Sequence, residues 1–563
     1  MPAKPTVKTT PEDPLAPFSD EVKRWFTASF EGATPAQAMG WRSISSGTDT
    51  LICAPTGSGK TLASFLWGID QLTRQKREVA AGRLPEPEPG VRLVYVSPLK
   101  ALSYDIERNL RAPLRGIGVE LSVGIRTGDT PQKERNRMRR EPPEILITTP
   151  ESLYLMISSG AREILTGVET VIVDEIHAVA ATKRGSHLAL TLERLDHLVA
   201  KSQEEREVPV EDRRRVQRIG LSATQRPLER IAGFLSGPGR KCEVVDPGQR
   251  KELDLEIVVP VEDMTAPEAE AGPHDDGSAD DAPIRSIWPA IYPELLEQVR
   301  SHTSTIVFVN NRRAAERLAQ RLNDLDQEKA EVESPHPTAT EGSGQNGSEK
   351  ARPHEDAGLP LARAHHGSLS HEERTEVEEQ LKSGLIPCLV ATSSLELGID
   401  MGAVDLVVQV ESPKSVARGL QRIGRAGHGL GETSKGRIFP KFRGDLLESA
   451  VVTRRMRDGQ IEETVIPSNP LDVLAQHLVS MAALDKWDTT EAYELVRRTT
   501  PFAELSIEQF ENVLDMLDGR YPSDRFAELR PRLVWDRTGK TIEGRKGARS
   551  LVVTNAGTIP DRG

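Results

Sequence analysis

The stretch LICAPTGSGKT, residues 51–61, joins three apolar residues to a glycine-rich turn and to the start of a helical pattern. It matches the phosphate-loop pattern G-x-x-x-x-G-K-[ST], except that Ala54 stands in place of the first glycine. In this motif, backbone N–H groups and the N-terminus of the following helix face phosphate groups. The spacing predicts that Lys60 reaches the β- and γ-phosphates of a nucleotide and that Thr61 binds Mg²⁺.

A second motif, VIVDEIHAV at residues 171–179, ends an apolar run with the adjacent carboxylates Asp174 and Glu175. Parallel strands bring their carboxyl ends to one edge of a sheet, so this pair would meet Lys60 and Thr61 there. A divalent cation would also offset the cost of burying two negative charges. We therefore interpret the pair as a Mg²⁺ ligand and a base that orients the attacking water.

The same alternation of short apolar runs and helix-length segments extends over most of the chain. The runs are TLICAP, RLVYVSP, EILITTP, TVIVDE and RIGLSAT, and later STIVFVN, PLARAHHG, CLVATS and VDLVVQVE. Nearly continuous apolar runs bounded by polar turns are typical of parallel strands with crossover helices. The sequence thus predicts an α/β fold with two parallel-sheet domains of similar plan.

From about residue 460 the pattern changes to helices followed by a hairpin. Pro470 predicts a helix start, and Ser506 with Gln509 predicts a capping box for a helix that Gly519 would end. The segment PRLVWDRTGKTIEGR, residues 531–545, predicts a hairpin around its central Thr-Gly pair. Helices followed by a hairpin are compatible with a winged-helix module.

The formal net charge of −12 would by itself argue against a nucleic-acid partner. Much of the acidic excess, however, lies in residues 261–283 and 326–358, whose Pro, Gly, Ser and acids predict linkers or disordered insertions. Net charge is therefore a poor guide to the charge of any one face of the protein.

The sequence also lacks signals for other compartments. The cysteines lack disulfide or zinc spacing, the N-terminus lacks a signal peptide, and no apolar run would span a bilayer. These features predict a cytoplasmic protein.

Kinases and GTPases with a phosphate loop would share the nucleotide motifs described so far. The second predicted domain and its stretch ARGLQRIGRAGHG, residues 417–429, separate the chain from them. An arginine aimed at the γ-phosphate across an interdomain cleft stabilises charge in the transition state. Such an arginine also makes hydrolysis depend on closure of the cleft.

An ordered set of motifs runs along the chain. The set comprises TPAQ (34–37), APTGSGKT (54–61), SPLKAL (97–102), RTGDT (126–130), TTPESL (148–153), DEIH (174–177), SAT (222–224), FVNNRR (308–313), HHGSLS (365–370), ATSSLELGIDMG (391–402) and QRIGRAGH (421–428). In this order the motifs resemble those of superfamily 2 helicases. KRGSHLALTLERL after DEIH, and SPKSVARGLQRIGRAGH, resemble the bacterial large helicase-related (Lhr) family in particular. The resemblance covers the chain from about residue 18 onward, apart from the acidic segments.

The resemblance implies two RecA-like domains in tandem, followed by a partial winged-helix module. The implied boundaries are a tail at 1–18, an ATP-binding domain at 19–252, an acidic linker at 253–287, a helicase C-terminal domain at 288–460 with the insertion 326–358, and a winged-helix region at 461–563. Similar proteins continue with a further core domain and a long C-terminal region. We therefore expect the chain to be a fragment or a truncated form.

The resemblance also implies roles for individual residues. Gln37 would read the adenine edge, which makes ATP the preferred nucleotide. The other nucleotide contacts would come from Thr56, Gly57, Ser58, Gly59, Lys60, Thr61, Gly398 and Asp400. Mg²⁺ would bind Thr61 and Asp174. The catalytic residues would be Lys60, Asp174, Glu175, Gln421, Arg422 and Arg425, of which we favour Arg425 as the arginine finger. The nucleotide site would be coupled to the nucleic-acid track by Ser222, Thr224 and His177.

Positions that match strand-contacting motifs form the implied nucleic-acid track. They are Pro98, Lys100, Arg126, Thr127, Thr149, Glu151, Asn310, Arg312, Thr392 and Ser393. Hydroxyls, backbone N–H groups and a few cations suit phosphate contacts that ignore base sequence, as a translocating motor requires. The alternative for the Ser and Thr residues is that they cap helices near strand ends.

The resemblance implies an ATP-dependent translocase that moves 3′-to-5′ on single-stranded DNA and unwinds duplexes, RNA–DNA hybrids among them, in DNA repair. Two alternatives remain open, namely an RNA-remodelling ATPase and an ATP-gated nucleic-acid clamp that does not translocate. Many RNA helicases of the superfamily end the QRIGRAGH motif in a further arginine, whereas His428 stands here. This departure weakens the first alternative, and the presence of Glu175 and Arg425 argues against the second.

Overall fold

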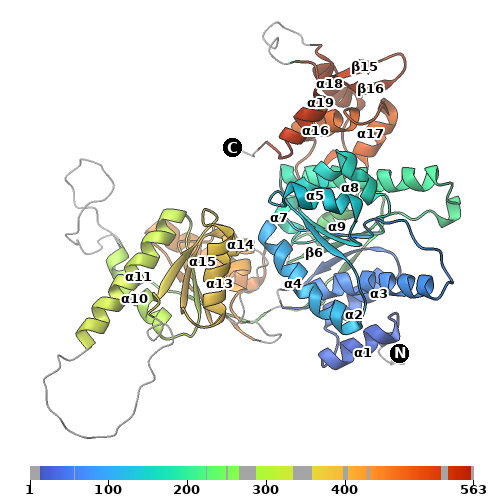
Figure 1. Cartoon of the computed structure of the whole chain (residues 1–563). Helices are drawn as coiled ribbons and strands as arrows, with labels where there is room; N and C mark the ends of the chain where they lie inside the picture. The colour runs from blue at the N-terminus through green and yellow to red at the C-terminus, as the bar shows by residue number, and fades with distance from the viewer. Residues whose placement is uncertain are drawn as a thin grey trace, which may run out of the picture. The chain divides into compact units, whose positions relative to one another are not determined.

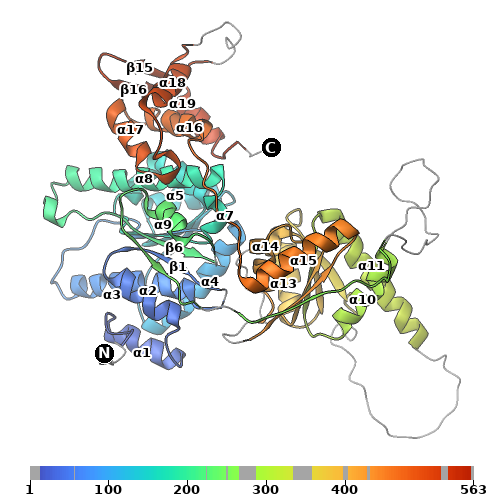
Figure 2. The same cartoon turned by 180° about the vertical axis from the view of Figure 1, so that it is seen from behind.

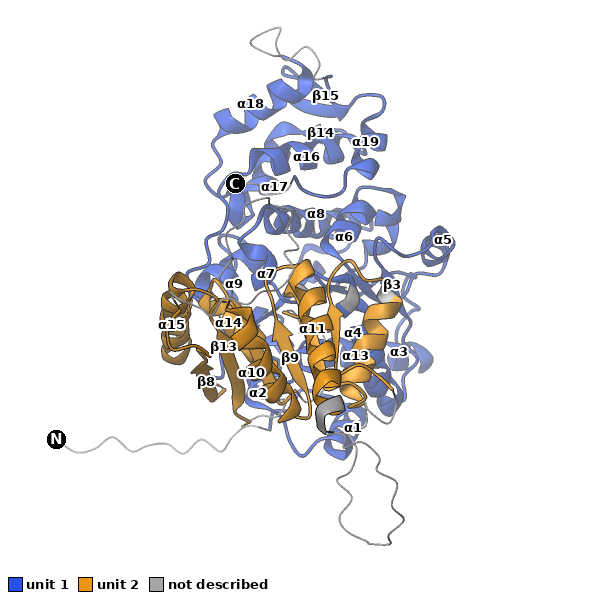
Figure 3. Ribbon diagram, turned by 90° about the vertical axis from the view of Figure 1, so that its left-hand side faces the viewer, with its two compact units in different colours: residues 1–54, 58–249, 463–563 blue, residues 55–57, 250–462 orange. Residues whose placement is uncertain are grey.

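The computed structural model describes residues 13–55, 57–223, 225–248, 251–264, 287–333, 358–396, 404–427, 432–520 and 530–559. The chain divides into two compact units (Figure 3). One unit contains residues 1–54, 58–249 and 463–563, and the other contains residues 55–57 and 250–462. Within the described ranges, none of the helices is long and apolar enough to cross a membrane.

A seven-stranded parallel sheet forms the centre of the first unit. Its strands lie in the order β3-β4-β2-β5-β6-β1-β7. Their bounds are β1 Asp49–Cys53, β2 Leu93–Val96, β3 Val123–Arg126, β4 Ile145–Thr148, β5 Thr170–Val173, β6 Gln217–Ser222 and β7 Cys242–Val245. Every neighbouring pair is parallel, which confirms the predicted α/β plan. The carboxyl ends of all these strands therefore meet at one edge.

Helices cover both faces of this sheet (Figures 1 and 2). One face carries α1 Asp20–Ser29, α2 Pro35–Ser45, α3 Lys60–Ala80 and α4 Lys100–Ile117. The other carries α6 Pro150–Ile157, η1 Gly160–Leu165, α7 His177–Ala180, α8 Lys183–Glu205 and α9 Leu228–Ser236, while α5 Gln132–Arg140 follows β3. Along β1, Leu51 and Cys53 pack into one core and Ile52 into the other. Burial on both faces explains why the strands read as continuous apolar runs.

The predicted N-terminal tail, residues 1–18, is wrong at its C-terminal end. Phe18 is only 3% exposed. Its ring makes edge-on contacts with Trp41 and Trp67, with centroid separations of 5.1 Å and 5.8 Å. Apolar burial therefore draws the end of the predicted tail into the first core. Residues 1–12 lie outside the described residues.

The second unit contains a six-stranded parallel sheet in the order β10-β11-β9-β12-β13-β8. Its strands are β8 Leu253–Ile257, β9 Thr305–Phe308, β10 Ala362–His365, β11 Cys388–Ala391, β12 Leu406–Val410 and β13 Ser434–Phe439. Its helices are α10 Trp288–Arg300, α11 Arg312–Glu333, α13 His371–Lys382, η3 Ser393–Leu395, α14 Val416–Ile423 and α15 Arg443–Asp458. This sheet confirms the prediction of a second parallel α/β domain.

Two predicted acidic segments are wrong at their N-terminal ends. The predicted linker 253–287 begins with strand β8, which pairs with β13 over its full length and buries Leu255. Helix α11 runs through the first residues of the predicted insertion 326–358. In this helix Asp326 accepts a hydrogen bond from Arg300 Nε at 2.8 Å. Pairing to distant residues thus orders both segment starts, whereas residues 265–286 and 334–357 lie outside the described residues.

The winged-helix region agrees closely with its sequence signals. Its elements are α16 Leu471–Ala482, β14 Trp487–Asp488, α17 Thr489–Arg497, η4 Thr500–Phe502, α18 Ile507–Asp518, β15 Leu533–Asp536, β16 Thr541–Gly544 and α19 Ala548–Thr554. Ser506 and Gln509 form the predicted capping box, and Gly519 ends α18 with a φ angle of +90°. Strands β15 and β16 form the predicted antiparallel hairpin.

The winged-helix region packs on α6, η1 and α8 within the first unit. Leu190 of α8 joins its apolar core. Arg162 donates from both Nη atoms to the two carboxylate oxygens of Asp485, and Lys183 Nζ lies 3.0 Å from Asp472 Oδ2. Elements more than 280 positions apart in the chain are thereby joined by direct polar contacts.

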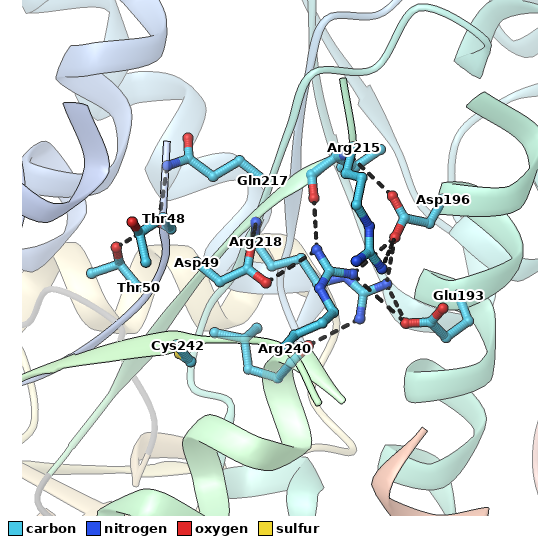
Figure 4. A network of polar contacts seen from close by, with 12 residues as sticks. Thr48, Asp49, Thr50, Glu193, Asp196, Arg215, Gln217, Arg218, Arg240 and Cys242 are labelled. Atoms are coloured by element: carbon cyan, nitrogen blue, oxygen red, sulfur yellow. Dashed lines mark hydrogen bonds and ion pairs between the residues drawn. The ribbon is translucent and has the colours of Figure 1, made fainter. Parts of the chain in front are cut away.

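A network of six ionisable side chains lies at the amino edge of the seven-stranded sheet (Figure 4). Its members are Asp49, Glu193, Asp196, Arg215, Arg218 and Arg240. Arg218 Nη2 donates to Glu193 Oε1 at 2.7 Å, and both side chains are almost fully buried. Arg240 lies 2.8 Å from Asp196 Oδ2 and 3.1 Å from Asp49 Oδ2. Three carboxylates thus compensate three guanidinium groups.

Candidate nucleotide site and nucleic-acid track

The phosphate loop between β1 and α3 requires glycine at two positions. Gly57 and Gly59 have φ angles of +82° and +77°, in the left-handed region that favours glycine. A Cβ atom at Gly59 would also lie 2.5 Å from Nε2 of Gln37. Thr34 Oγ1 donates to the carbonyl of Ser58 at 2.8 Å, so helix α2 holds the loop from outside. Thr56 lies outside the described residues.

The structure places Gln37 beside this loop, where the sequence predicts an adenine-reading side chain. Its Oε1 accepts the N–H of Thr34 at 3.0 Å, as part of the capping box of α2. Because Oε1 is held in this way, Nε2 is the atom that lies against Gly59. The role of Gln37 in reading adenine stays a prediction.

Helix α3 begins at Lys60, so the predicted phosphate-binding residues lie in its first turn. Lys60 Nζ donates to the carbonyl of Ala54 at 2.5 Å, which folds the side chain over the loop. The first N–H groups of a helix lack intrahelical partners and carry a positive partial charge. This loop, the Lys60 ammonium and the start of a 21-residue helix together fit a phosphate-rich anion.

Asp174 lies directly after β5 and is only 8% exposed. Its Oδ1 accepts the N–H of Glu175 at 2.8 Å, and its Oδ2 accepts the hydroxyl of Tyr95. Burial, reinforced by the negative charge of Glu175, raises the pKa of Asp174 to about 6. A buried carboxylate of this kind is stabilised by a nearby cation. The Asp174 carboxylate and the hydroxyl of Thr61, its predicted partner, are both oxygen donors, the ligand type that Mg²⁺ prefers.

Glu175 has a φ angle of +44°, in a backbone region that side chains other than glycine rarely adopt. Such a conformation costs of order 1–3 kcal/mol and persists only where the surroundings hold it. Here the carbonyl of Glu175 accepts the N–H of Ala178 at 2.8 Å, in the turn that leads into α7. Strain of this kind is concentrated at functional sites, which is consistent with the predicted catalytic role.

His177 connects the acidic motif to the end of β6. Its Nδ1 accepts the N–H of Ala223 at 3.2 Å and lies 3.3 Å from Ser222 Oγ. Burial lowers the pKa of His177 to about 4, so the imidazole is neutral near pH 7. The 3.5 Å approach of Glu175 Oε2 to the same nitrogen is therefore not an ion pair. These contacts suit the predicted coupling role of Ser222 and His177, while Thr224 lies outside the described residues.

The strand order divides the carboxyl edge of the first sheet into two halves. The nucleotide motifs follow the neighbouring strands β5, β6 and β1. The predicted track motifs follow the neighbouring strands β3, β4 and β2. Sequence spacing alone does not reveal this separation, because β2 and β3 lie between β1 and β5 in the chain. The fold therefore places the predicted nucleotide residues and the predicted track residues of this domain on adjacent halves of one sheet edge.

Several predicted track residues of the first domain are held in place by polar contacts with nearby residues. Lys100 Nζ lies 2.7 Å from Asp129 Oδ1. Thr127 is buried and its N–H donates to Thr130 Oγ1, while Thr149 Oγ1 donates to Ser152 Oγ at 3.0 Å. Thr149 also precedes α6, but its side chain makes no capping bond to the helix in the described structure. The helix-capping alternative is thus wrong for Thr149.

Arg126, at the end of β3, is a cation without a counter-charge among the described residues. Its Nη1 is buried and makes no hydrogen bond within the described structure. Burial, together with the positive charges of Arg135 and Arg139, lowers the pKa of Arg126 to about 10. A half-buried guanidinium beside two others favours an anionic partner such as a phosphate.

Glu151 of α6 is engaged by a residue that our sequence reasoning did not single out. Arg184 Nε donates to Glu151 Oε1 at 2.5 Å, and Arg184 Nη2 donates to Glu151 Oε2 at 3.0 Å. The same Nη2 donates to the carbonyl of Pro98 at 2.8 Å. The available sequence signal was KRGSHLALTLERL, directly after DEIH, which contains Arg184. The carboxylate predicted to contact the strand is therefore paired within the protein.

In the second unit, the four predicted track residues converge on one pocket of about 600 Å³. Its lining consists of Asn310, Asn311, Arg312, Arg313, Thr392 and Ser393. The first four residues follow β9 and the last two follow β11, which is its hydrogen-bonded neighbour. Arg312 Nη1 donates to Ser368 Oγ at 2.5 Å. Amides, guanidinium groups and hydroxyls around one hollow suit contacts to a sugar-phosphate backbone.

The predicted catalytic arginines of the second unit lie on and just after α14. Arg422 is buried and donates to Gln409 Oε1 at 2.7 Å and to the carboxylate of Glu396. Arg425 Nη2 donates to the carbonyl of Glu396 at 2.9 Å, and Gln421 is half-buried on the same helix. Both arginines thus hold the segment that follows β11. The predicted nucleotide residues Gly398 and Asp400, and also His428, lie outside the described residues.

Three family models match successive parts of the chain. A DEAD/DEAH box helicase model matches residues 34–231, a helicase conserved C-terminal domain model matches residues 354–429, and a large helicase-related protein winged-helix model matches residues 454–563. In chain order, the three matches fall in the first parallel domain, in the second parallel domain and in the winged-helix region.

Similar proteins match almost the whole chain. The Lhr helicase/probable uracil glycosylase of Mycolicibacterium smegmatis is 51% identical over 99% of this chain and 35% of its own length. The ATP-dependent helicase Lhr-Core of Methanocaldococcus jannaschii is 40% identical over 96% of this chain and 57% of its own length. The solved structure of Mycobacterium smegmatis helicase Lhr bound to ssDNA and AMP-PNP has a TM-score of 0.79 and 49% identity, over 98% of this chain and 63% of that one. The chain thus spans about a third of the bacterial relative and somewhat over half of the archaeal one.

Proposed function

We propose that this chain, which belongs to the Lhr (large helicase-related) family of superfamily 2 helicases, is an ATP-driven motor. In this proposal the motor moves along single-stranded DNA. The observation that carries this proposal is the division of one sheet edge into a nucleotide half and a track half. A machine that converts hydrolysis into movement needs both sites on one rigid element, so that a change at one reaches the other.

Several groups at the predicted nucleotide site support ATP hydrolysis as the reaction. The phosphate loop and Lys60 hold the phosphates, and Thr61 with Asp174 would hold Mg²⁺, which neutralises phosphate charge when bound. Glu175 orients the attacking water. The neutral imidazole of His177 relays a change at this point to Ser222, because its Nδ1 contacts both ends. Arg425 is our proposed arginine finger.

The track residues support binding that does not depend on base sequence. Arg126, Thr127 and Thr149 in the first domain offer a cation and hydroxyl-bearing turns, and the pocket of the second domain adds amides and guanidinium groups. The related Lhr structure contains ssDNA and AMP-PNP, and this supports single-stranded DNA and ATP as the ligands here. We further propose 3′-to-5′ movement, unwinding of duplexes including RNA–DNA hybrids, and a role in DNA repair in the bacterial cytoplasm or nucleoid.

Steady-state ATP hydrolysis tests this proposal directly. Rates would be measured without nucleic acid, with single-stranded DNA and with RNA of the same sequence, at one fixed salt concentration because phosphate contacts are salt-sensitive. We expect stronger stimulation by DNA than by RNA. Equal or stronger stimulation by RNA would favour an RNA-remodelling ATPase, and strand binding without hydrolysis would leave only an ATP-gated clamp.

A further inference from the structure

Arg184, in the first turn of α8, joins the two segments that carry much of the predicted track in the first domain. It donates to the carbonyl of Pro98, which follows β2, and to both carboxylate oxygens of Glu151, in the first turn of α6. Burial alone would raise the pKa of Glu151, but the hydrogen bonds and charge of Arg184 hold that pKa below its usual value. Glu151 is therefore ionised and compensated near pH 7.

The turn between the acidic motif and Arg184 is tightly packed. Thr182 Oγ1 donates to the carbonyl of Val179 at 2.7 Å and accepts the N–H of Gly185 at 3.2 Å. A Cβ atom at Gly185 would lie 2.2 Å from the Val179 carbonyl oxygen, so the backbones of α7 and α8 are in direct contact. Such close packing leaves little free space between α7 and the start of α8, where Arg184 lies.

We propose that Arg184 is a positioning residue for the nucleic-acid strand, and that it forms a second route from the acidic motif to the track. The first route runs through His177 and Ser222. The inference rests on the proposed function and adds to it a residue that touches neither nucleotide nor strand. Arg184 acts by fixing the loop after β2 against α6 and by compensating the charge of Glu151.

Charge compensation gives this role a physical basis. Glu151 lies two residues after Thr149, which is a predicted phosphate contact. An uncompensated carboxylate at that distance would repel a phosphate group. The planar guanidinium matches the two carboxylate oxygens and still reaches a third acceptor, whereas the ammonium of lysine cannot form this fork. Arg184 thus reduces the repulsion between the Glu151 carboxylate and the phosphates of a nucleic-acid strand.

The test compares Arg184→Gln with the double variant Arg184→Gln/Glu151→Gln in the full 563-residue chain. We expect Arg184→Gln to raise about tenfold the single-stranded DNA concentration that gives half-maximal ATPase stimulation, because a charge-assisted bond is lost. The KM for ATP should change by less than about twofold. In the double variant the repelling charge is gone, so half-maximal stimulation should return to within about threefold of wild type. Arg184→Lys should fall between wild type and Arg184→Gln.

Arg162→Gln is the matched control. Arg162 makes the same two-bond ion pair, with Asp485, and both pairs have side chains that are 33% exposed at each partner. Its partner lies in the winged-helix region and not beside the track. A general loss of stability would therefore affect both variants, whereas a positioning role separates them. Fluorescence anisotropy of a labelled oligonucleotide measures strand affinity even if a variant hydrolyses ATP poorly.

The outcomes distinguish this inference from the proposed function. If wild type shows no DNA-stimulated hydrolysis, the proposed function fails and the inference fails with it. If wild type is stimulated but Arg184→Gln behaves like Arg162→Gln, only the inference is overturned. A double variant that binds DNA as weakly as Arg184→Gln would also overturn it, since charge compensation then has no part in strand binding.

Discussion

The two edges of the seven-stranded sheet each bury an aspartate, but the contacts of the two carboxylates differ. At the amino edge, Asp49 is 7% exposed and its two carboxylate oxygens face the N–H of Arg218 and the guanidinium of Arg240. At the carboxyl edge, Asp174 is 8% exposed, but its hydrogen-bond partners are the neutral hydroxyl of Tyr95 and its neighbour's N–H. Equal burial therefore does not mean equal compensation.

This difference separates charges that stabilise the fold from charges that serve a ligand. Once buried, a compensated network costs several kcal/mol to break, because removal of one partner leaves the other without a counter-charge. A carboxylate whose burial is only partly offset instead has a raised pKa, as Asp174 does despite the Tyr95 hydroxyl and the charge of Lys60. Such a carboxylate would gain from a cation that arrives with the substrate. For Asp49 and Asp174, compensation within the protein thus distinguishes a structural carboxylate from one that we propose serves a ligand.

The largest effect is expected where the functional edge loses its base. Glu175→Gln should lower the kcat of ATP hydrolysis by about 10²–10⁴-fold, the usual contribution of a general base. ATP binding and strand binding should persist, because the amide is nearly isosteric with the carboxylate. Nucleotide binding by calorimetry and strand binding by anisotropy would establish both points.

Glu229→Gln is the control for this variant, since Glu229 is an exposed residue on α9 of the same domain. It should leave kcat unchanged. Ordinary hydrolysis by Glu175→Gln would remove Glu175 from the mechanism and would make the acidic motif a metal-binding element alone.

The structural edge should respond in stability. Arg218→Met leaves Glu193 buried without its 2.7 Å partner, and breaking a buried pair in this way costs about 3–5 kcal/mol. Urea unfolding at pH 7.5 would measure the loss. Arg215→Met is the matched change in the same network, but Arg215 is 59% exposed and its contact with Asp196 is 3.5 Å, so about 0–1 kcal/mol is expected. Similar losses in both variants would mean that burial does not set the value of these pairs.

Much of the functional edge could be predicted from sequence because its signals are local. The phosphate loop needs glycine at positive φ beside a lysine and a threonine, and these lie within a few residues of one another. The Ser506–Gln509 capping box is equally local. In such cases the backbone chemistry of a short segment determines both the residue types and their spacing.

The structural edge could not be predicted, because its partners are distant in the chain. Arg218 and Glu193 are 25 positions apart. The same limit applies at the carboxyl edge to Arg184 and Glu151, which are 33 positions apart. The same limit explains the predicted segment ends that were wrong. Composition suggested disorder around Asp326, whereas its contact with Arg300 depends on two helices packing together. Composition counts the acidic residue Asp326, but it does not reveal that Arg300 pairs with it.

The same substitution at the two edges sharpens the comparison. Asp174→Asn should stabilise the protein by about 0.5–2 kcal/mol while abolishing hydrolysis, because it removes a poorly compensated charge and the Tyr95 hydroxyl can accept from the new amide. Asp49→Asn should instead destabilise it by about 1–3 kcal/mol, since Arg240 loses one of its buried counter-charges. Urea unfolding of the two variants in parallel would measure both effects, and shifts of the same sign would contradict the distinction between the edges.

The smallest effect concerns the acid side of the pH profile. Asp174 has a pKa of about 6 and, as the proposed Mg²⁺ ligand, would have to be ionised, so kcat/KM for ATP should fall about tenfold per pH unit below about pH 6. The hydroxyl of Tyr95 lowers this pKa, and Tyr95→Phe should therefore move the acid limb to higher pH by up to about one unit, the value of one hydrogen bond. His177 should not contribute to the acid limb, because burial holds its pKa near 4.

Phe65, which stacks on the Tyr95 ring with centroids 4.9 Å apart, provides the control for Tyr95→Phe. Phe65→Leu perturbs the same packing without removing the donor and should leave the limb in place. An unmoved limb in Tyr95→Phe would mean that a group other than Asp174 sets the acid dependence.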